Sequence, residues 1–175
     1  GEWQEKSLAE LTSLITKGTT PQNFTESGVT YVKIEGFKDG YIDQSKCLFI
    51  DEKIHISELK RSILKEGDVL FAIAGATIGK CGLVTKEILP ANTNQALAII
   101  RLKKEAHIDF TLSILKSNIM LKYIQNNIAG GAQPNLNLQQ IANFSFIIPT
   151  LPEQTKIANF LTTIDERINQ LTHKK

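Results

Sequence analysis

The last segment of the chain carries a repeat that restricts the fold more than any other feature. Its apolar residues recur at alternating steps of four and three, and they are Ile157, Leu161, Ile164, Ile168 and Leu171. This spacing matches the a and d positions of a heptad repeat and predicts a helix with an apolar seam. Pro152 and Glu153 suit the first turn of such a helix, and Lys174 and Lys175 suit its C-terminal end.

The predicted helix covers residues 151–175 and is roughly 35 Å long at about 1.5 Å per residue. Burying five side chains of this kind is worth roughly 1.5–3 kcal/mol each, so the seam is expected to be covered. The sequence leaves two possibilities for what covers the seam. One is a helix of another segment or chain, as in a coiled coil, and the other is the surface of the chain's own domain.

The residues before this helix show short strand and turn patterns. Strands are predicted over the following residues: 29–34, 47–50, 69–74, 81–85, 96–102 and 144–148. Helices are predicted over residues 52–59 and 110–127, and residues 7–15 fit either a helix or a strand. Asp39 and Gly40 form a hairpin signal. We therefore expect an α+β, β-rich domain over residues 1–150, followed by a coiled-coil-type helix over residues 151–175.

Composition excludes several classes of protein. The chain has 175 residues, enough for one domain and an appendage, and its net charge of +2 is too balanced to indicate nucleic acid by itself. Two cysteines far apart in the sequence favour a reducing cytoplasm and do not form a metal-site pattern. No apolar run is long enough to span a membrane, and the first residues lack a secretory pattern, so no membrane association is expected.

A search for catalytic patterns finds none. His55, His107 and His173 do not have metal-ligand spacing and are expected to be surface or packing residues. Residues 58–60 have the acid-x-lysine form of some nucleases, but they lie in a predicted helix without an upstream aspartate on a strand. Residues 75–80 lack the second half of a phosphate-binding loop, because Lys80 is followed by a cysteine. We therefore expect no catalytic residue, no metal and no cofactor in this chain.

Polar loops offer a different chemistry. Asparagine and glutamine side chains can form two hydrogen bonds with adenine, and lysine can reach guanine or a phosphate. The candidate DNA-binding residues in these loops and turns are Lys17, Thr19, Thr20, Lys33, Lys80, Gln133 and Asn135. Structural roles compete with this one. Residues 75–80 fit a tight turn, Asn135 can stabilise the turn after Pro134, and Asn137 can cap a short helix that runs through Ile141.

Several of these segments resemble type I restriction specificity subunits. Residues 151–158, Leu-Pro-Glu-Gln-Thr-Lys-Ile-Ala, resemble the conserved-region helix of that family. The Lys-Gly-Thr-Thr-Pro loop at 17–21 resembles a loop near the start of its target recognition domains. Residues 67–80 are similar to a central strand-turn-strand, and residues 131–136 to the loop before the last strand. Trp3 followed by Leu8 completes the set, which covers nearly the whole chain in the family's order.

The resemblance implies a role in a restriction-modification complex. A target recognition domain of this family reads half of a split double-stranded DNA target and has no catalytic residues. The conserved helix packs antiparallel against another such helix and docks methylating subunits, which carry S-adenosylmethionine and modify adenine. A nuclease-translocase subunit joins for restriction.

The chain departs from the family in one respect, because its members usually have two recognition domains and two helices. It is therefore either a half-length subunit or half of a longer one. The unpaired seam favours a homodimer, which would present two identical readers. The predicted helix length is comparable with one turn of B-DNA, about 34 Å. The main alternative is a DNA- or protein-binding module without strong sequence preference, and the second is a nuclease or methyltransferase fragment.

Overall fold

The computed structural model describes residues 2–128 and 134–172. Eleven strands occur in this part of the chain. The strands are β1 (Gln4–Ser7), β2 (Thr12–Lys17), β3 (Val29–Val32), β4 (Phe37–Lys38), β5 (Tyr41–Ile42), β6 (Leu48–Ile50), β7 (Val69–Ala72), β8 (Cys81–Leu83), β9 (Ala91–Thr93), β10 (Leu97–Leu102) and β11 (Ser145–Ile148). The α-helices are α1 (Leu8–Leu11), α2 (Glu52–Ile56), α3 (Ile108–Leu115), α4 (Asn118–Asn127), α5 (Leu138–Ala142) and α6 (Leu151–Thr172). The mixed α+β class is thus confirmed.

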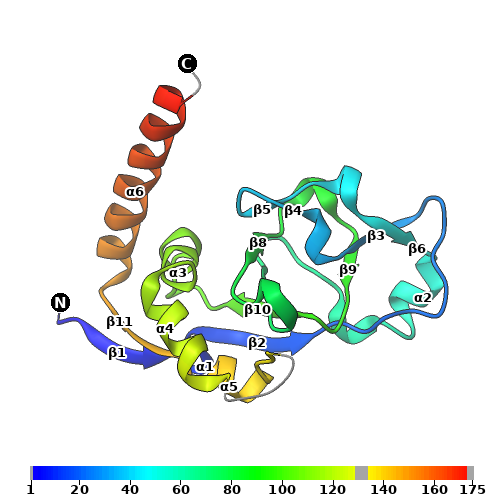
Figure 1. Cartoon of the computed structure of the whole chain (residues 1–175), viewed down its shortest axis with the longest axis horizontal. Helices are drawn as coiled ribbons and strands as arrows, with labels where there is room; N and C mark the ends of the chain where they lie inside the picture. Colours follow the sequence, from blue (N-terminus) through cyan, green and yellow to red (C-terminus); the bar gives the residue numbers. More distant parts are fainter. Residues whose placement is uncertain (1, 129–133, 173–175) are drawn as a thin grey trace.

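The strands form three sheets, and the largest of them organises the molecule. Its six strands have the order β2-β10-β7-β8-β5-β4, while β6-β3-β9 and β1-β11 form the smaller sheets. In Figure 1 the β-rich body lies on the right, and α6 projects away from it beyond α3. Within the described residues no helix is long and apolar enough to cross a membrane.

The central strands of the six-stranded sheet are buried on both faces. Alternate residues of β7 face opposite sides, so that Phe71 packs with helices α3 and α4 while Leu70 packs with the residues around β3 and β9. The same alternation in β10 places Ile100 on the first side and Ile99 on the second. This explains why both strands appear in the sequence as continuous apolar runs.

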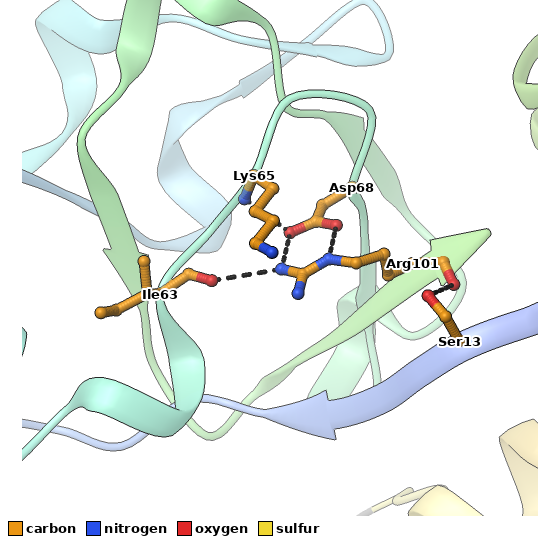
Figure 2. Close-up of polar contacts among 5 residues, drawn as sticks. All are labelled: Ser13, Ile63, Lys65, Asp68 and Arg101. Carbon is orange, nitrogen blue, oxygen red and sulfur yellow. Dashed lines mark hydrogen bonds and ion pairs between the residues drawn. The ribbon is translucent and has the colours of Figure 1, made fainter. Parts of the chain in front are cut away.

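Figure 2 shows how the edge of the sheet where β7 begins is fixed. Nε of Arg101 donates to Oδ1 of Asp68 at 2.8 Å, and Nη2 donates to Oδ2 at 2.8 Å. The side chain of Asp68 is fully buried and that of Arg101 is 22% exposed. Asp68 also accepts from the backbone N–H of Lys65, and Arg101 donates to the carbonyl of Ile63. We call this the ion-paired edge (Ile63, Lys65, Asp68 and Arg101).

Several predicted elements differ in their bounds from those observed. Residues 7–15 hold both alternatives, because Ser7 caps the short α1 in a capping box and the chain then becomes extended at Thr12. The predicted hairpin at Asp39 and Gly40 is confirmed, with φ of 52° and 83° at these two residues. The helix predicted over residues 52–59 is shorter and ends at Ile56.

The single helix predicted over residues 110–127 is wrong. It is divided at Lys116, and Ser117 starts a new helix by accepting a hydrogen bond from the backbone N–H of Ile119 at 3.2 Å. A serine cap competes with helix continuation at this position. Ile119 is consequently 54% exposed and does not share a buried face with Leu115.

Helix α6 is attached to the body through its first turns. Oε2 of Glu153 accepts hydrogen bonds from the backbone and hydroxyl of Thr150, and these bonds lower the pKa of Glu153. Gln154 is buried, and its Oε1 accepts from the backbone N–H of His107 at 2.8 Å. Nε2 of Gln154 donates to the carbonyls of Glu105 and Pro149. This glutamine therefore joins the helix to two other segments of the chain.

Candidate DNA interface

Most of the sequence-predicted DNA-binding residues lie at the other end of the central strands of the six-stranded sheet, away from the ion-paired edge. The register pairs Lys17 with Ala98, and Ala72 with Leu97, so β2 and β7 end where β10 begins. Strand β8 begins at the same edge, since Phe71 pairs with Cys81. We call this region the loop edge and define it by four segments. They are residues 17–20, 94–95, 75–80 and 134–135.

The first segment, residues 17–20, is held against the chain that follows β9. The backbone N–H of Gly18 donates to the carbonyl of Asn94, and that of Thr19 to the carbonyl of Thr93. Only glycine fits at position 18, because a Cβ atom there would lie 1.8 Å from the carbonyl oxygen of Thr93. The Lys17 and Thr19 residues are exposed.

Thr20 and Gln95 connect the first two segments through their side chains. Oγ1 of Thr20 donates to Oε1 of Gln95 at 2.5 Å, and both residues are exposed. Tyr31 supports the same loop from below, since its hydroxyl donates to the carbonyl of Thr19 at 2.9 Å. Burial raises the pKa of Tyr31 to about 12, so this hydroxyl keeps its proton at neutral pH.

The second pair of segments is joined by backbone hydrogen bonds. The backbone N–H of Gly75 donates to the carbonyl of Pro134 at 3.0 Å, and that of Leu136 donates to the carbonyl of Ile73 at 2.9 Å. The structure thereby brings together the turn that ends at Lys80 and the loop that contains Asn135, and both of these residues are exposed. Gln133 lies outside the described residues.

Lys33 is placed beside this region by the three-stranded sheet. Strand β3 runs parallel to β9 and pairs Val32 with Thr93, so the two strands end at the same side of the three-stranded sheet. Nζ of Lys33 lies 3.8 Å from Oε1 of Glu35, and the lysine side chain is 39% exposed. An exposed pair of this kind is weak, so Lys33 keeps its charge available to a phosphate.

A buried hydrogen-bond network lies beneath the loop edge. Oδ1 of Asn92 accepts from the hydroxyl of Ser62 at 2.6 Å and from the backbone N–H of Thr93 at 2.9 Å. Its Nδ2 lies 3.1 Å from Nδ1 of His55 and donates to the carbonyl of Leu59. Desolvation lowers the pKa of His55, which keeps the ring neutral and able to accept this hydrogen bond. His55 is thus a packing residue.

Sequence reasoning missed two residues of this region. Gln95 is exposed, and its Oε1 accepts a hydrogen bond from Thr20. Asn92 fixes the end of strand β9, which precedes Gln95. The available signal was a short polar stretch, residues 92–95, directly before the apolar strand β10. Asn137 has the competing structural role, because it caps α5 in a capping box with Gln140.

The chemistry of the loop edge is that of hydrogen bonding and positive charge. Its exposed groups are amides, hydroxyls and ammonium groups, which suit base edges and phosphates. In the described ranges, no three His, Cys, Asp or Glu residues are grouped so that they could hold a metal ion. Cys47 and Cys81 are free and buried, and desolvation raises their pKa to about 11 and about 12. Both thiols are therefore protonated and poor nucleophiles.

The seam of α6 remains largely uncovered by the body. Ile157 is half-buried against the core, but exposure rises from 37% at Leu161 to 71% at Leu171. The interpretation that the seam lies on its own domain thus holds fully for Ile157, while Leu161 and Ile164 are partly covered at 37% and 38% exposure. Ile164 and Ile168 line an open groove that faces α3 and the β4–β5 hairpin.

Comparison with known proteins identifies the family. The family model of the type I restriction modification DNA specificity domain matches residues 1–175. The EcoBI specificity subunit of Escherichia coli is 26% identical over 159 residues, covering 85% of this chain and 32% of that protein. The MjaVIII specificity subunit of Methanocaldococcus jannaschii is 27% identical over 173 residues, covering 95% of this chain and 40% of that protein. The chain thus spans about a third to two fifths of these relatives.

Solved structures share the fold. A chain from a study of assembly and conformational transition in the type I restriction-modification system gives a TM-score of 0.74 at 18% identity, covering 98% of this chain and 40% of that one. The HsdS subunit from Thermoanaerobacter tengcongensis gives 0.71 at 18% identity, with 99% and 40% covered. The S subunit from M. genitalium gives 0.63 at 18% identity, with 98% and 41% covered. The protein belongs to the family of type I restriction-modification specificity subunits, whose DNA specificity domain it matches along its whole sequence.

Proposed function

We propose that this chain reads one half of a bipartite DNA sequence for a type I restriction-modification complex. The observation that carries the proposal is the loop edge, where four segments distant in sequence are joined in two pairs by hydrogen bonds. Lys17, Lys80 and Asn135 are exposed there in segments that hydrogen bonds fix to the end of the six-stranded sheet. Side chains on such a support can be held in a fixed register with base edges.

The loop edge contributes contacts of two kinds. Amide side chains such as those of Gln95 and Asn135 can distinguish bases, because each base pair shows its own donors and acceptors in the major groove. Lys17, Lys33 and Lys80 suit phosphates, which position the protein without specifying sequence. A net charge of only +2 gives a single copy little long-range attraction to DNA, so binding is expected to need the assembled complex.

The chemistry of modification and restriction is assigned to partner subunits. Methylating subunits would hold S-adenosylmethionine and modify adenine, and a nuclease-translocase subunit would join them for restriction. This chain would supply recognition and docking with no cofactor of its own. Such a complex would act in the cytoplasm.

We also propose that the chain acts as a dimer through α6. Its seam is exposed along most of a helix of 22 residues, about 33 Å long at about 1.5 Å per residue. That length is close to one turn of B-DNA, about 34 Å, and makes the helix a suitable spacer between two readers. A two-fold dimer of this chain would recognise two identical half-sites in inverted orientation.

The test is co-expression with the cognate methylating subunit in an unmethylated host, followed by mapping of modified adenines across the genome. Methylation at a split motif with identical inverted halves is the expected result. A motif with unlike halves would show that a second, different recognition domain takes part. An assembled complex that adds no methylation would refute sequence recognition and support a binding module without sequence preference, which would bind all duplexes alike with a strong salt dependence.

A further inference from the structure

The turn that carries Gln95 is fixed by hydrogen bonds within itself and to two other segments. Oδ1 of Asn94 accepts from the backbone N–H of Ala96 at 3.1 Å, which tightens the turn between β9 and β10. The carbonyl of Asn94 also accepts from the N–H of Gly18 at 3.1 Å. The carbonyl of Ala96 accepts from the N–H of Ile73 at 2.9 Å. The backbone on both sides of Gln95 is therefore tied to the residues that directly follow β2 and β7.

The side chain of Gln95 is oriented by Thr20. Its Oε1 accepts from the hydroxyl of Thr20 at 2.5 Å, although Gln95 itself is exposed. Thr20 follows Thr19, whose N–H donates to the carbonyl of Thr93. The carbonyl of Thr19 accepts from the hydroxyl of Tyr31 at 2.9 Å, and Tyr31 is completely buried. The amide of Gln95 is thus supported by a series of contacts that reaches the core.

The hydrogen bond from Thr20 uses one of the four hydrogen-bonding positions of the Gln95 amide. An amide oxygen accepts two hydrogen bonds and the nitrogen donates two, so one acceptor and both donors remain for a ligand. In the major groove adenine presents an acceptor at N7 beside a donor at N6, which match the nitrogen and the oxygen of an amide. Guanine presents two acceptors there, and cytosine presents only a donor at N4. An amide whose oxygen is held in one place therefore suits adenine best.

We propose that Gln95 is a specificity-determining residue that selects adenine at one position of the target, and that Thr20 is a positioning residue that holds the Gln95 amide. This inference rests on the proposed recognition of DNA and adds the base, the residue that reads it and the support of that residue. In this assignment Thr20 acts through Gln95. The target sequence therefore depends on the identity of residue 95, whereas the fold does not.

A change of specificity tests the role of Gln95. Gln95→Glu keeps the length of the side chain and an oxygen for Thr20, but a carboxylate only accepts hydrogen bonds. Since cytosine presents a donor, the assembled complex should change its preference from adenine to cytosine at one position and keep the others. The complex is titrated with duplexes that carry each base at each position of the motif found by methylation mapping. We expect the ratio of the adenine and cytosine dissociation constants to shift at least about tenfold.

Gln4→Glu is the matched control, because Gln4 is exposed and lies on β1, outside the loop edge. It introduces the same charge and should leave all binding constants unchanged. A Gln95→Glu complex that keeps the wild-type preference at every position, or that weakens on all duplexes alike, would overturn the reading of adenine while sequence recognition stands. A wild-type complex that binds all duplexes alike would overturn the proposed function as well.

A pair of conservative variants tests the role of Thr20. Thr20→Val removes the hydroxyl and keeps the shape, and should reduce the adenine preference at this same position about tenfold. Thr20→Ser keeps a hydroxyl and should retain the preference. A general loss of stability would weaken binding to every duplex, so a change confined to one position separates positioning from a structural role. An intact preference in Thr20→Val, or an equal loss for all four bases, would refute the positioning role.

Discussion

The two ends of the six-stranded sheet are built in opposite ways. At the ion-paired edge, Arg101 and Asp68 form a bidentate pair that is largely removed from water. At the loop edge, Lys80 and Asn135 are exposed, and the segments that hold them are joined mainly by backbone hydrogen bonds. The two ends of the same short strands therefore differ in role, one being structural and the other a candidate for binding. A buried ion pair lies where no ligand is expected, and exposed polar side chains lie where one is.

The largest expected effect comes from breaking the ion-paired edge. Asp68→Ala should lower the free energy of unfolding by about 3–5 kcal/mol, because Arg101 would be left partly buried without a counter-charge. Urea denaturation measures this change. The control is Glu35→Ala, which removes the exposed partner of Lys33 and should cost no more than about 1 kcal/mol. Equal losses in the two variants would contradict a special role for this edge.

The second prediction concerns the buried network beneath the loop edge. Asn92→Ala removes the shared partner of Ser62, His55 and the backbone of Thr93, and should cost about 1–3 kcal/mol of stability. DNA binding by the complex should weaken as well, since Thr93 leads into the loop edge. The same substitution at the exposed Asn23 should change stability by less than about 0.5 kcal/mol. If Asn92→Ala unfolds at the same denaturant concentration as the wild type, the network does not contribute to stability.

The loop edge itself should show the reverse behaviour, with normal stability and altered binding. Asn135→Ala should cost about 1–3 kcal/mol of binding free energy and relax one position of the target, whereas Lys80→Ala should weaken all sequences alike. Both are measured by titrating the assembled complex with a set of target variants. Lys104 is exposed and lies near the ion-paired edge, so Lys104→Ala is the matched control and should bind normally. A binding loss from Lys104→Ala alone would show that DNA binds at the ion-paired edge and not at the loop edge.

The smallest effect is a dependence of stability on pH. Since burial lowers the pKa of His55 in the folded chain, the unfolded chain binds the proton first as pH falls through about 6.5. The contribution of the neutral ring is complete above that pH and is lost below it, by no more than about 1.4 kcal/mol for each pH unit. Comparing wild type with His55→Gln between pH 7.5 and about 5 isolates this histidine. If the unfolding free energy changes equally with pH in both proteins, His55 does not contribute to the pH dependence.

Continuous apolar runs predicted the central strands of the large sheet correctly. Residues 69–74 and 96–102 were identified as buried strands because Phe71 and Ile99 stand in runs that pack on both faces. The break at Ser117 was missed, since a single cap outweighed a helical spacing that continued across it. Local sequence therefore identified most of the elements, but it missed β1, β9 and the boundary at Ser117.

Contacts between distant residues explain what else the sequence did not reveal. Asp68 and Arg101 are 33 positions apart, and no local pattern indicates that they pair, although Asp68 lies in the segment 67–80 that resembles the family. Gln95 became a candidate only when its hydrogen bond with Thr20 was seen across 75 positions. In contrast, Lys17, Lys80 and Asn135 were named from loop chemistry alone, and the sheet register places them at one edge. Their contacts with DNA stay predictions.

The attachment of α6 through Gln154 has an evolutionary consequence. Its three hydrogen-bond partners are Glu105, His107 and Pro149, and none of them belongs to the loop edge. Substitutions among residues 17–20, 75–80 or 94–95 therefore remove none of the hydrogen bonds through which Gln154 holds the helix. Under the proposed function, a lineage carrying this chain would acquire new target sequences by mutation or by exchange of the loops while the attachment of the helix is kept.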